Sequence, residues 1–418
     1  MGTEKKGIVF IVSGKSPITL PGGLGAYSNN LANIFRKLGF RVFVLGFSKQ
    51  AEEIEKNGIT FIHIKTPFNW LRGLGVGFIT PYFLRALMKK VEEYNPPEII
   101  VFGMATWNYV GYKIKLKLKQ RNIKTLASCF TTHKHELKGN IRGAQIKDYG
   151  YLPHFKYMLA YVMDRLFIQY FDKKAITEAD KVIVHYESTR KIIEDDYGPF
   201  LPGKILRIPY CVEIYKRTSE EQKDKGVLHL GKKRPWVVVI CRQDPRKGIN
   251  TFIKAVGILK KQALDFDCYI IGSGPFLRNN ERLTRRLGLE RDIQFLGFVD
   301  DIKLFLEEAD AYVLPSVEEG SGAISLLEAM KLGVPIVTTR CDGIPEDFTH
   351  ERNALLVDMH DEQDMADQIK RILEDGKLKM KLSENAKRDY NKKFTFEKMS
   401  QEVERVINNL WREENARA

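Results

Sequence analysis

The sequence predicts an α/β protein built from two Rossmann-like, doubly wound parallel-sheet domains in tandem. At 418 residues, the chain exceeds the length at which one hydrophobic core keeps growing, which favours two domains of about 200 residues each. Short β-rich runs alternate with helical patterns along both halves. A charged stretch with almost no periodic apolar face, Lys216 to Arg234, separates the two series.

The N-terminal half begins with a β-α-β unit. A β-rich run from Ile8 to Val12 is followed by a Gly/Pro loop from Pro17 to Gly25 and then by apolar residues at helical spacing. Thr80 and Pro81 are expected to cap and open a helix from Tyr82 to Tyr94. Further strands are expected at Val42–Leu45, Ile59–Ile64, Glu98–Phe102, Lys124–Phe130 and Lys181–His185.

The C-terminal half repeats this alternation. Each expected strand is followed by a helical pattern, the order that places parallel strands in one sheet. The expected domains are therefore 1–215 and 235–393, joined by a linker at 216–234, with a C-terminal helix in 394–418 that packs back across the domains. The strands are expected at Trp236–Cys241, Asp267–Gly272, Asp292–Leu296, Ala311–Leu314 and Pro335–Thr339.

The net charge of +14 lies entirely in the N-terminal half. Residues 1–215 contain 32 Lys and Arg against 18 Asp and Glu, whereas residues 216–418 contain 35 of each kind. A basic face on one domain attracts anionic lipid headgroups, phosphorylated acceptors or nucleic acid. No recognition-helix, zinc or RNA-binding pattern accompanies the charge, so no nucleic acid partner is expected.

The cysteine and hydropathy patterns indicate a cytoplasmic protein. The five cysteines are widely spaced, form no C-x-x-C pair and mostly fall in apolar runs, as reduced buried thiols do. The first apolar run is short and is interpreted as a strand and not as a signal peptide. No apolar run reaches the roughly 18 residues of a membrane-spanning helix. We therefore expect a cytoplasmic chain that is peripheral to the inner face of the cell membrane.

Ligands of open α/β sheets bind outside the carboxyl ends of the strands, so the loops at these ends are candidate sites. After the strand that ends at Cys241, Arg242 and Lys247 lie in a loop that leads into a helix. Two cations so placed can neutralise a diphosphate that gains charge as a glycosidic bond breaks. A solvated basic turn is the alternative interpretation.

A second loop follows the strand that ends at Leu314. Its glycines lead into a helix, whose first backbone amides form a favourable seat for phosphate. Glu319 in the loop and Glu328 in the helix are spaced to hold hydroxyls of two different sugars. Alternatively, Glu328 is a buried structural carboxylate, although burial without a partner is costly.

The order and spacing of these motifs resemble the retaining glycosyltransferases of family 4, which have the GT-B fold. Glu319 to Met330 resembles that family's E-x7-E pattern, and Arg242 to Gly248 resembles its GR…KG loop. The resemblance extends over nearly the whole chain. Further segments that resemble family motifs are Gly22–Gly25, Ile208–Val212, Gly272–Pro275, Phe295–Val299 and Asp342–Glu346.

The resemblance implies a donor site for a nucleotide diphosphate sugar, with UDP or GDP as the expected nucleotide. It implies that Arg242 and Lys247 bind the diphosphate, Glu319 the donor sugar and Glu328 the ribose, and that the first three act in catalysis. It also implies retention of the anomeric configuration without a metal or other cofactor. Further implied donor-binding residues are Gly22, Gly23, Gly25, Gly274, Phe298, Gly320, Ser321, Gly322, Ala323 and Ile324.

Two positions depart from the family pattern. Eight residues separate Glu319 from Glu328 where the family has seven. Either the loop absorbs one extra residue before the helix, or Glu319 is not the equivalent carboxylate. The segment after Pro209 reads Tyr210-Cys211, where the family usually has Asn-Gly.

Two histidines follow the strand that is expected to end near Phe130. Members of the family place a histidine at this strand end, near the donor sugar; His133 fits the position best and His135 second. We therefore expect His133 to belong to the catalytic group. Ordinary loop histidines are the alternative.

Two segments that mix aromatic and basic residues are candidates for the acceptor side of the protein. They occur in 68–72 and again in 155–170. Such mixtures suit a membrane interface and equally suit an ordinary helix packed on a sheet. The positive charge of the N-terminal half favours peripheral membrane contact.

Together these features predict a glycosyltransferase that moves a hexose from a nucleotide sugar to an anionic or lipid-linked glycan acceptor. Cell-surface polysaccharide, lipopolysaccharide or glycolipid is the expected product. Two alternatives stay open: a GT-B nucleotide-sugar epimerase that needs no acceptor, and a non-catalytic sugar-nucleotide-binding protein at the membrane. An epimerase would convert the nucleotide sugar in an assay without acceptor. A non-catalytic protein would bind the nucleotide sugar without turning it over.

Overall fold

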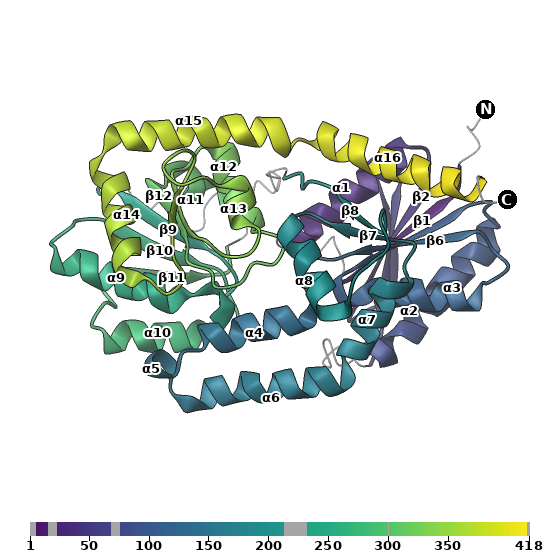
Figure 1. The fold of residues 1–418 in the computed structure, drawn as a ribbon, viewed down its shortest axis with the longest axis horizontal. Coiled ribbons are helices and arrows are strands. Elements are labelled where there is room, and N and C mark those ends of the chain that lie inside the picture. Colours follow the sequence, from purple (N-terminus) through teal and green to yellow (C-terminus); the bar gives the residue numbers. More distant parts are fainter. Residues whose placement is uncertain (1–5, 16–22, 68–75, 213–231, 300, 416–418) are drawn as a thin grey trace. The chain divides into compact units, whose positions relative to one another are not determined.

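The computed structural model describes residues 6–15, 23–67, 76–212, 232–299 and 301–415, which form two compact units (Figure 1). The N-terminal unit comprises Met1–Lys134, Val162–Cys211 and Thr395–Ala418, and the C-terminal unit comprises His135–Tyr161 and Val212–Phe394. This division differs from the expected domain limits mainly in one segment, because His135–Tyr161 belongs to the C-terminal unit. Most of the expected linker lies outside the described residues.

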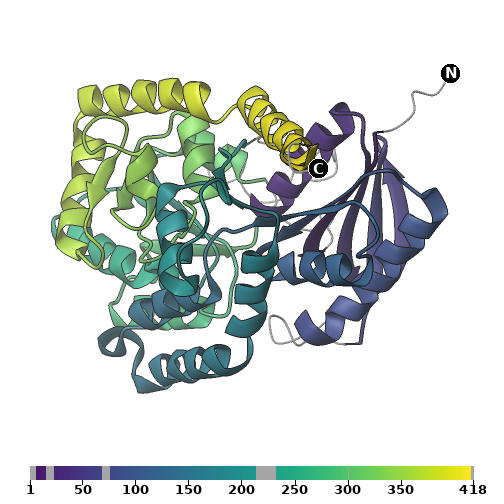
Figure 2. The ribbon, with the colours of Figure 1, turned by 45° about the vertical axis from the view of Figure 1, so that its right-hand side comes forward.

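The N-terminal unit is built on an eight-stranded sheet with the order β3-β4-β2-β1-β5-β6-β7-β8. All neighbouring strands are parallel except β3 and β4. Helices lie on both faces of this sheet (Figure 2). Its strands are β1 (Ile8–Lys15), β2 (Arg41–Ser48), β3 (Glu52–Lys56), β4 (Ile59–Lys65), β5 (Ile99–Met104), β6 (Ile123–Ser128), β7 (Lys181–Val184) and β8 (Ile205–Arg207).

The helices of this unit cover the buried central strands, whose apolar residues point to both faces as in other parallel sheets. The last helix of the chain packs on the first: the Lys37 ammonium lies 4.4 Å from the centre of the Phe396 ring. The helices are α1 (Gly23–Lys37), α2 (Val76–Tyr94), α3 (Asn108–Lys117), α7 (Gln169–Glu178), α8 (Glu187–Tyr197) and α16 (Phe396–Asn415). Two more, α4 (His133–Gly143) and α6 (Tyr151–Phe167), contribute residues to both units.

The start of α2 differs from the prediction. The helix begins at Val76, so Pro81 lies inside it and Thr80 does not cap it. The Thr80 hydroxyl instead donates a hydrogen bond of 2.6 Å to the Val76 carbonyl, one turn back. The prediction was wrong because proline commonly marks a first turn, whereas here the buried side chains of Val76 and Ile79 extend the packed face by another turn.

Three short strands were not predicted. The strand β3 reads EEIEK, with Ile54 as its single apolar residue, and forms the antiparallel edge of the sheet. Charged side chains are common on edge strands because they oppose pairing with other chains. The other two, β8 and β14 (Leu355–Val357), have three residues each, which is too short for a periodic pattern.

The C-terminal unit contains a six-stranded, fully parallel sheet with the order β11-β10-β9-β12-β13-β14. The strands are β9 (Trp236–Ile240), β10 (Asp267–Ile271), β11 (Ile293–Gly297), β12 (Ala311–Leu314), β13 (Ile336–Thr339) and β14. The first five confirm the predicted strands to within a residue at each end. The helical elements are α5 (Ile146–Tyr149), η4 (Pro245–Lys247), α9 (Ile249–Lys261), α10 (Leu277–Arg286), α11 (Lys303–Glu308), α12 (Ile324–Leu332), α13 (Ile344–Asp347), α14 (Glu362–Glu374) and α15 (Gly376–Lys393).

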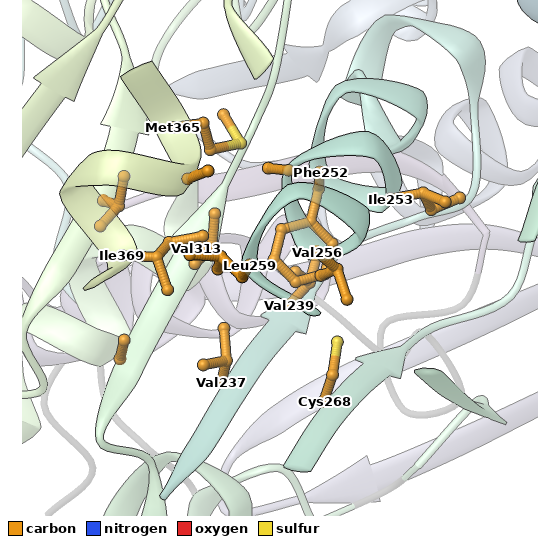
Figure 3. Close-up of a cluster of buried hydrophobic side chains, with 14 of the residues drawn as sticks. Val237, Val239, Phe252, Ile253, Val256, Leu259, Cys268, Val313, Met365 and Ile369 are labelled. Carbon is orange, nitrogen blue, oxygen red and sulfur yellow. The ribbon is translucent and has the colours of Figure 1, made fainter. Parts of the chain in front are cut away.

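A hydrophobic core lies on one face of this sheet (Figure 3). Val237 and Val239 of β9 point towards Phe252 of α9, and Met365 and Ile369 of α14 complete the cluster. All five residues of β9 are buried, which explains why its sequence, WVVVI, is apolar throughout. The core holds the carboxyl ends of β9 and β12 in fixed positions for the loops that follow.

Within the described ranges, no helix is both long and apolar enough to cross a bilayer. All five cysteines are free thiols, as predicted.

Candidate active site

Two loops meet where the strand order of the C-terminal sheet reverses. The chain continues from β9 outward to β10 on one side and from β12 outward to β13 on the other. Ligands of open α/β sheets bind outside the carboxyl ends of the strands at such a reversal. The loops after β9 and β12, residues 241–248 and 315–323, therefore form the candidate site.

Glycines bring the loop after β9 into backbone contact with its neighbours. Gly248 has a φ of 62°, and a Cβ at this position would lie 2.0 Å from the Pro315 carbonyl oxygen. A Cβ on Gly274 would lie 2.5 Å from the Gln243 carbonyl oxygen. Both distances exclude a side chain, so these glycines fix the loop geometry. A contact of Gly274 with the donor stays a prediction.

Lys247 and Glu319 form an ion pair that joins the two loops. The Lys247 Nζ lies 2.5 Å from the Glu319 Oε1, and the side chains are only 10% and 4% exposed. The Ser316 hydroxyl donates a hydrogen bond to the same carboxylate oxygen. The sequence assigned both charged residues to one site, and the structure places them in direct contact.

A second ion pair lies beside the first. The Arg246 Nη1 lies 2.9 Å from the Glu318 Oε2, and the Arg246 Nε lies 3.6 Å from the Glu136 Oε1. Glu318 is completely buried, and this burial raises the pKa of its carboxyl although Arg246 acts in the opposite direction. The other oxygen of Glu318, Oε1, accepts no hydrogen bond from any residue in the described part of the chain. A buried acceptor without a donor is uncommon in folded proteins and makes Glu318 a candidate ligand contact.

Arg242 has a different environment from Lys247. Its Nε lies 2.8 Å from the Asp244 Oδ2, while 57% of its side chain is exposed. The two predicted phosphate-binding cations therefore differ: Lys247 is fixed in the protein, and Arg242 keeps guanidinium donors that face solvent.

Asp342 organises the loop after β12 from the neighbouring strand end. Its Oδ2 accepts hydrogen bonds of 2.8 Å from the backbone amides of Glu319 and Gly320. Its Oδ1 lies 3.1 Å from the His135 Nε2. Burial raises the pKa of Asp342, but the contacts with His135 and the two amides outweigh burial and lower that pKa overall. The Gly320 amide is thus already bound to a carboxylate of the protein.

The helix α4 brings His135 to this group through a glycine face. A Cβ on Gly139 would lie 2.4 Å from the Glu318 Cβ, and one on Gly143 would lie 1.9 Å from the Pro245 carbonyl oxygen. The two glycines are one turn apart, so a single face of the helix touches both loops.

The N-terminus of α12 is uncapped. Its N-cap residue, Ala323, offers no side-chain hydrogen bond, and within the described residues no backbone acceptor binds the amides of Ala323 and Ile324. Gly320 and Gly322 have φ values of 52° and 73°, which glycine adopts without strain, and the Ser321 side chain is buried. Free amides and the helix dipole suit this end to an anion.

Glu328 lies in the second turn of α12 and is partly exposed. Burial raises its pKa to about 7, with Lys331 acting in the opposite direction. Among the described residues, no hydrogen-bond donor reaches its carboxylate. This argues against a structural carboxylate satisfied inside the protein. Phe298, the other predicted donor contact at the rim, follows β11 and is 52% exposed.

The predicted glycine loop belongs to the N-terminal unit. Gly23 and Gly25 lie in the first turn of α1, after the carboxyl end of β1, and Gly22 lies outside the described residues. The strand order of this sheet reverses between β1 and β5, so these glycines also follow a strand at a reversal point.

The two histidines differ in their contacts. The His133 Nδ1 lies 3.0 Å from the Asp164 Oδ1 within the N-terminal unit. His135 contacts Asp342, as described above, and so joins the loops of the C-terminal unit. The structure thus brings His135, which fitted the family position second best, into contact with the charged loop residues. The catalytic role of His133 stays a prediction.

One group of side chains among the described residues has a spacing that suits a metal ion. His135, Glu318 and Asp342 each offer a ligand atom, and these atoms lie within 4.8 Å of one another. The Arg246 guanidinium binds the Glu318 carboxylate and would oppose a cation at this point. The donor set therefore fits a metal poorly. Asp265 and Asp267, at the start of β10, pair with Arg234 outside this group.

Sequence reasoning missed the pair of Arg246 and Glu318 and named Asp342 only as part of a motif. The available signal was position: Arg246 precedes Lys247, and Glu318 precedes Glu319, in loops that already carried candidate residues. An irregular loop has no regular alternation of side chains, so the sequence does not show that both of two adjacent charged residues form ion pairs.

Two family models match the chain and together cover most of it. Residues 21–215 match the Glycosyltransferase Family 4 model, and residues 220–389 match the model described as Glycosyl transferases group 1.

Individual proteins show the same relationship. An uncharacterized glycosyltransferase of Methanocaldococcus jannaschii is 23% identical over 415 residues, which are 95% of this chain and 97% of the relative. LpsE, a lipopolysaccharide core biosynthesis glycosyltransferase of Rhizobium meliloti, is 33% identical over 162 residues, which are 38% of this chain and 46% of that protein. The crystal structure of HepE from Anabaena in complex with UDP-glucose has a TM-score of 0.70 at 17% identity and covers 96% of this chain and 100% of that one. This last likeness shows the fold alone. With two parallel-sheet units, charged loops at a strand-order reversal and both family models matched, the chain is a glycosyltransferase of the GT-B fold that belongs to glycosyltransferase family 4.

Proposed function

We propose that this glycosyltransferase transfers a hexose from a UDP or GDP sugar, with retention of configuration, to a lipid-linked or otherwise anionic glycan at the cytoplasmic face of the cell membrane. The observation that carries the proposal is the set of buried charges at the ends of β9 and β12. Lys247 and Arg246 supply cations, and Glu318 and Glu319 supply acceptors, beside the uncapped N-terminus of α12.

The donor diphosphate is assigned to the cationic part of this group. Lys247 is held by Glu319, and Arg242 keeps free donors towards solvent. The amides at the start of α12 add partial positive charge. A leaving diphosphate gains negative charge as the glycosidic bond breaks, so groups already in place stabilise the transition state without reorganisation.

The sugar and the ribose are assigned to the carboxylates. The free Oε1 of Glu318 and the carboxylate of Glu319 can accept hydrogen bonds from sugar hydroxyls. Glu328 has no donor from the described residues and can accept from the ribose hydroxyls. His133 and the glycines Gly23 and Gly25 are assigned to the same donor on the strength of the family motif.

In front-face attack, the acceptor oxygen bonds to the anomeric carbon on the face from which the diphosphate leaves, the bond from that carbon to the diphosphate breaks, and the hydroxyl proton passes to the departing diphosphate. The configuration at the anomeric carbon is therefore retained. The fixed cations make a metal unnecessary for charge neutralisation. The relatives support the acceptor class, since they include glycosyltransferases of lipopolysaccharide, colanic acid and glycolipid biosynthesis.

A donor-turnover assay with Glu328→Ala tests this proposal. Release of UDP or GDP from a panel of nucleotide sugars is measured with and without a glycolipid acceptor, and NMR reports the anomeric configuration of the product. We expect Glu328→Ala to lose most donor turnover and the matched change Glu374→Ala, at an exposed position of α14, to keep it. Unchanged turnover in Glu328→Ala would reject the site, an inverted product would reject retention, and acceptor-independent epimerisation would reject transfer.

A further inference from the structure

The helix α6 (Figure 1, teal) has an unusual distribution of side chains. The only buried residue among its seventeen is an aspartate, Asp164. Nine of its residues are exposed hydrophobic side chains: Tyr151, Leu152, Phe155, Met158, Leu159, Val162, Met163, Leu166 and Phe167. An apolar patch of this size is rare on a protein that meets only water.

These apolar residues form one continuous stripe. Leu152, Phe155, Leu159, Val162 and Leu166 follow each other at spacings of three and four, which places them on one side of a helix. At 3.6 residues per turn, the exposed Lys156 and Arg165 fall on opposite flanks of this stripe. The stripe also lines a shallow depression formed by Tyr151, Leu152, His154, Phe155 and Met158.

The charges around the helix are sorted by sign. Every acidic residue between Ile146 and Lys173 is buried: Asp148, Asp164 and Asp172 are 5%, 3% and 7% exposed. They have internal partners, since Asp148 binds Lys254, Asp164 lies by His133, and Asp172 accepts a hydrogen bond from Tyr197. Every basic residue of the same segment is exposed, namely Lys147, Lys156, Arg165 and Lys173.

We infer that α6 is a docking surface for a bilayer that contains anionic phospholipid. The apolar stripe would enter the boundary between headgroups and acyl chains, and the flanking Lys156 and Arg165 would meet the lipid phosphates. At seventeen residues the helix is about 25 Å long and lies on a membrane rather than across it. A second copy of the chain fits less well, because two such surfaces would bring like charges together. The docking surface would bring the enzyme to a lipid-linked acceptor in the bilayer. In this point the inference rests on the proposed function.

Sedimentation with vesicles tests the surface, using the full chain without nucleotide sugar. We expect the protein to bind vesicles of phosphatidylcholine with roughly one third phosphatidylglycerol at least ~10-fold more tightly than vesicles of phosphatidylcholine alone. The triple variant Leu152→Gln, Phe155→Gln, Leu159→Gln should lose at least ~10-fold in vesicle affinity, because it removes apolar area from the interface. The matched triple variant Leu201→Gln, Leu287→Gln, Met380→Gln changes exposed apolar residues on other elements and should bind like the wild type.

The outcomes separate this inference from the proposed function. Acceptor-free donor hydrolysis should be unchanged in the α6 variant, so a defect in lipid binding and a defect in donor chemistry are read independently. Equal binding of the α6 variant and the wild type, or no binding of the wild type to anionic vesicles, would overturn the inference. A concentration-dependent dimer that the α6 variant abolishes, without lipid binding, would assign the stripe to a second copy and overturn it as well.

Discussion

The Lys247 ammonium lies 2.5 Å from the Glu319 carboxylate, and hardly any of either side chain is exposed. Burial of two charges costs more than their mutual attraction returns unless further hydrogen bonds support them. Here the Ser316 hydroxyl provides one such bond. We interpret the pair as a preorganised part of the donor site, in which each charge keeps the other in place.

Removing the lysine should leave an unpaired buried carboxylate. We expect Lys247→Met to lower the free energy of unfolding by about 3–5 kcal/mol, the usual cost of breaking a buried pair. Urea denaturation followed by circular dichroism measures this change. A Lys247→Met variant as stable as the wild type would show that the buried Glu319 carboxylate does not need the Lys247 ammonium.

The double variant Lys247→Met, Glu319→Gln separates stability from function. Because neither charge remains, we expect it to recover to within about 1–2 kcal/mol of the wild type while donor turnover stays lost. Recovery of turnover along with stability would contradict a functional role of the two charges.

The glycine face of α4 should be intolerant of a side chain. In Gly143→Ala the new Cβ would meet the Pro245 carbonyl oxygen at 1.9 Å, so either α4 or the loop after β9 must move. We expect a higher KM for the nucleotide sugar and a lower Tm. The control is Gly376→Ala at the start of α15, where a Cβ meets nothing within 4 Å. Equal kinetics in both variants would rule out a role of α4 in positioning the loop.

The stability contribution of Glu328 should depend on pH. Its pKa is raised from 4.5 to about 7, so between these values the folded state keeps a proton that the unfolded state has lost. The free energy of unfolding therefore falls as pH rises through this window and levels off above it. One pKa unit is worth about 1.4 kcal/mol, and partial exposure reduces the total, so we expect a fall of roughly 1–3 kcal/mol.

Glu328→Gln should abolish this fall, since an amide does not titrate. The free energy of unfolding of both proteins is measured by urea denaturation at about pH 5 and about pH 8. The value for the variant minus the value for the wild type should be larger at the higher pH. A constant difference across the window would mean that the Glu328 pKa is not raised.

Donor turnover should not require a metal ion. The Arg246 guanidinium next to Glu318 opposes a cation at the group formed with His135 and Asp342. We expect equal initial rates before and after treatment with EDTA. Loss of activity that Mn²⁺ or Mg²⁺ restores would assign a metal to these three residues.

Strand positions were largely predictable because parallel central strands are buried on both faces. The run WVVVI of β9 is apolar throughout, as a strand buried on both faces of a sheet must be. The loop after it therefore lies at the carboxyl ends of the strands, where ligands of open α/β sheets bind. Lys247 and Glu319 were found by that reasoning. In contrast, β3 was missed because its charged sequence carries no burial signal.

The contribution of α4 could not be predicted from local pattern. His135 and Asp342 are 207 positions apart, and their contact depends on Gly139 and Gly143 fitting against two loops of the other half of the sequence. The family resemblance favoured His133 by its position after β6, and neither the resemblance nor the local pattern showed that His135 would contact Asp342. The resemblance likewise did not show that both Glu318 and Glu319 would be buried and paired.

Calorimetric titration with UDP and with GDP tests the central claim, that the charged group at the ends of β9 and β12 binds the donor. The wild type should bind one of the two nucleotides, and the double variant Lys247→Met, Glu319→Gln should bind it about 10- to 100-fold more weakly, as expected for the loss of a charge-assisted contact worth about 1.5–3 kcal/mol. Equal affinity of the two proteins for the same nucleotide would contradict the assignment of the donor to this group.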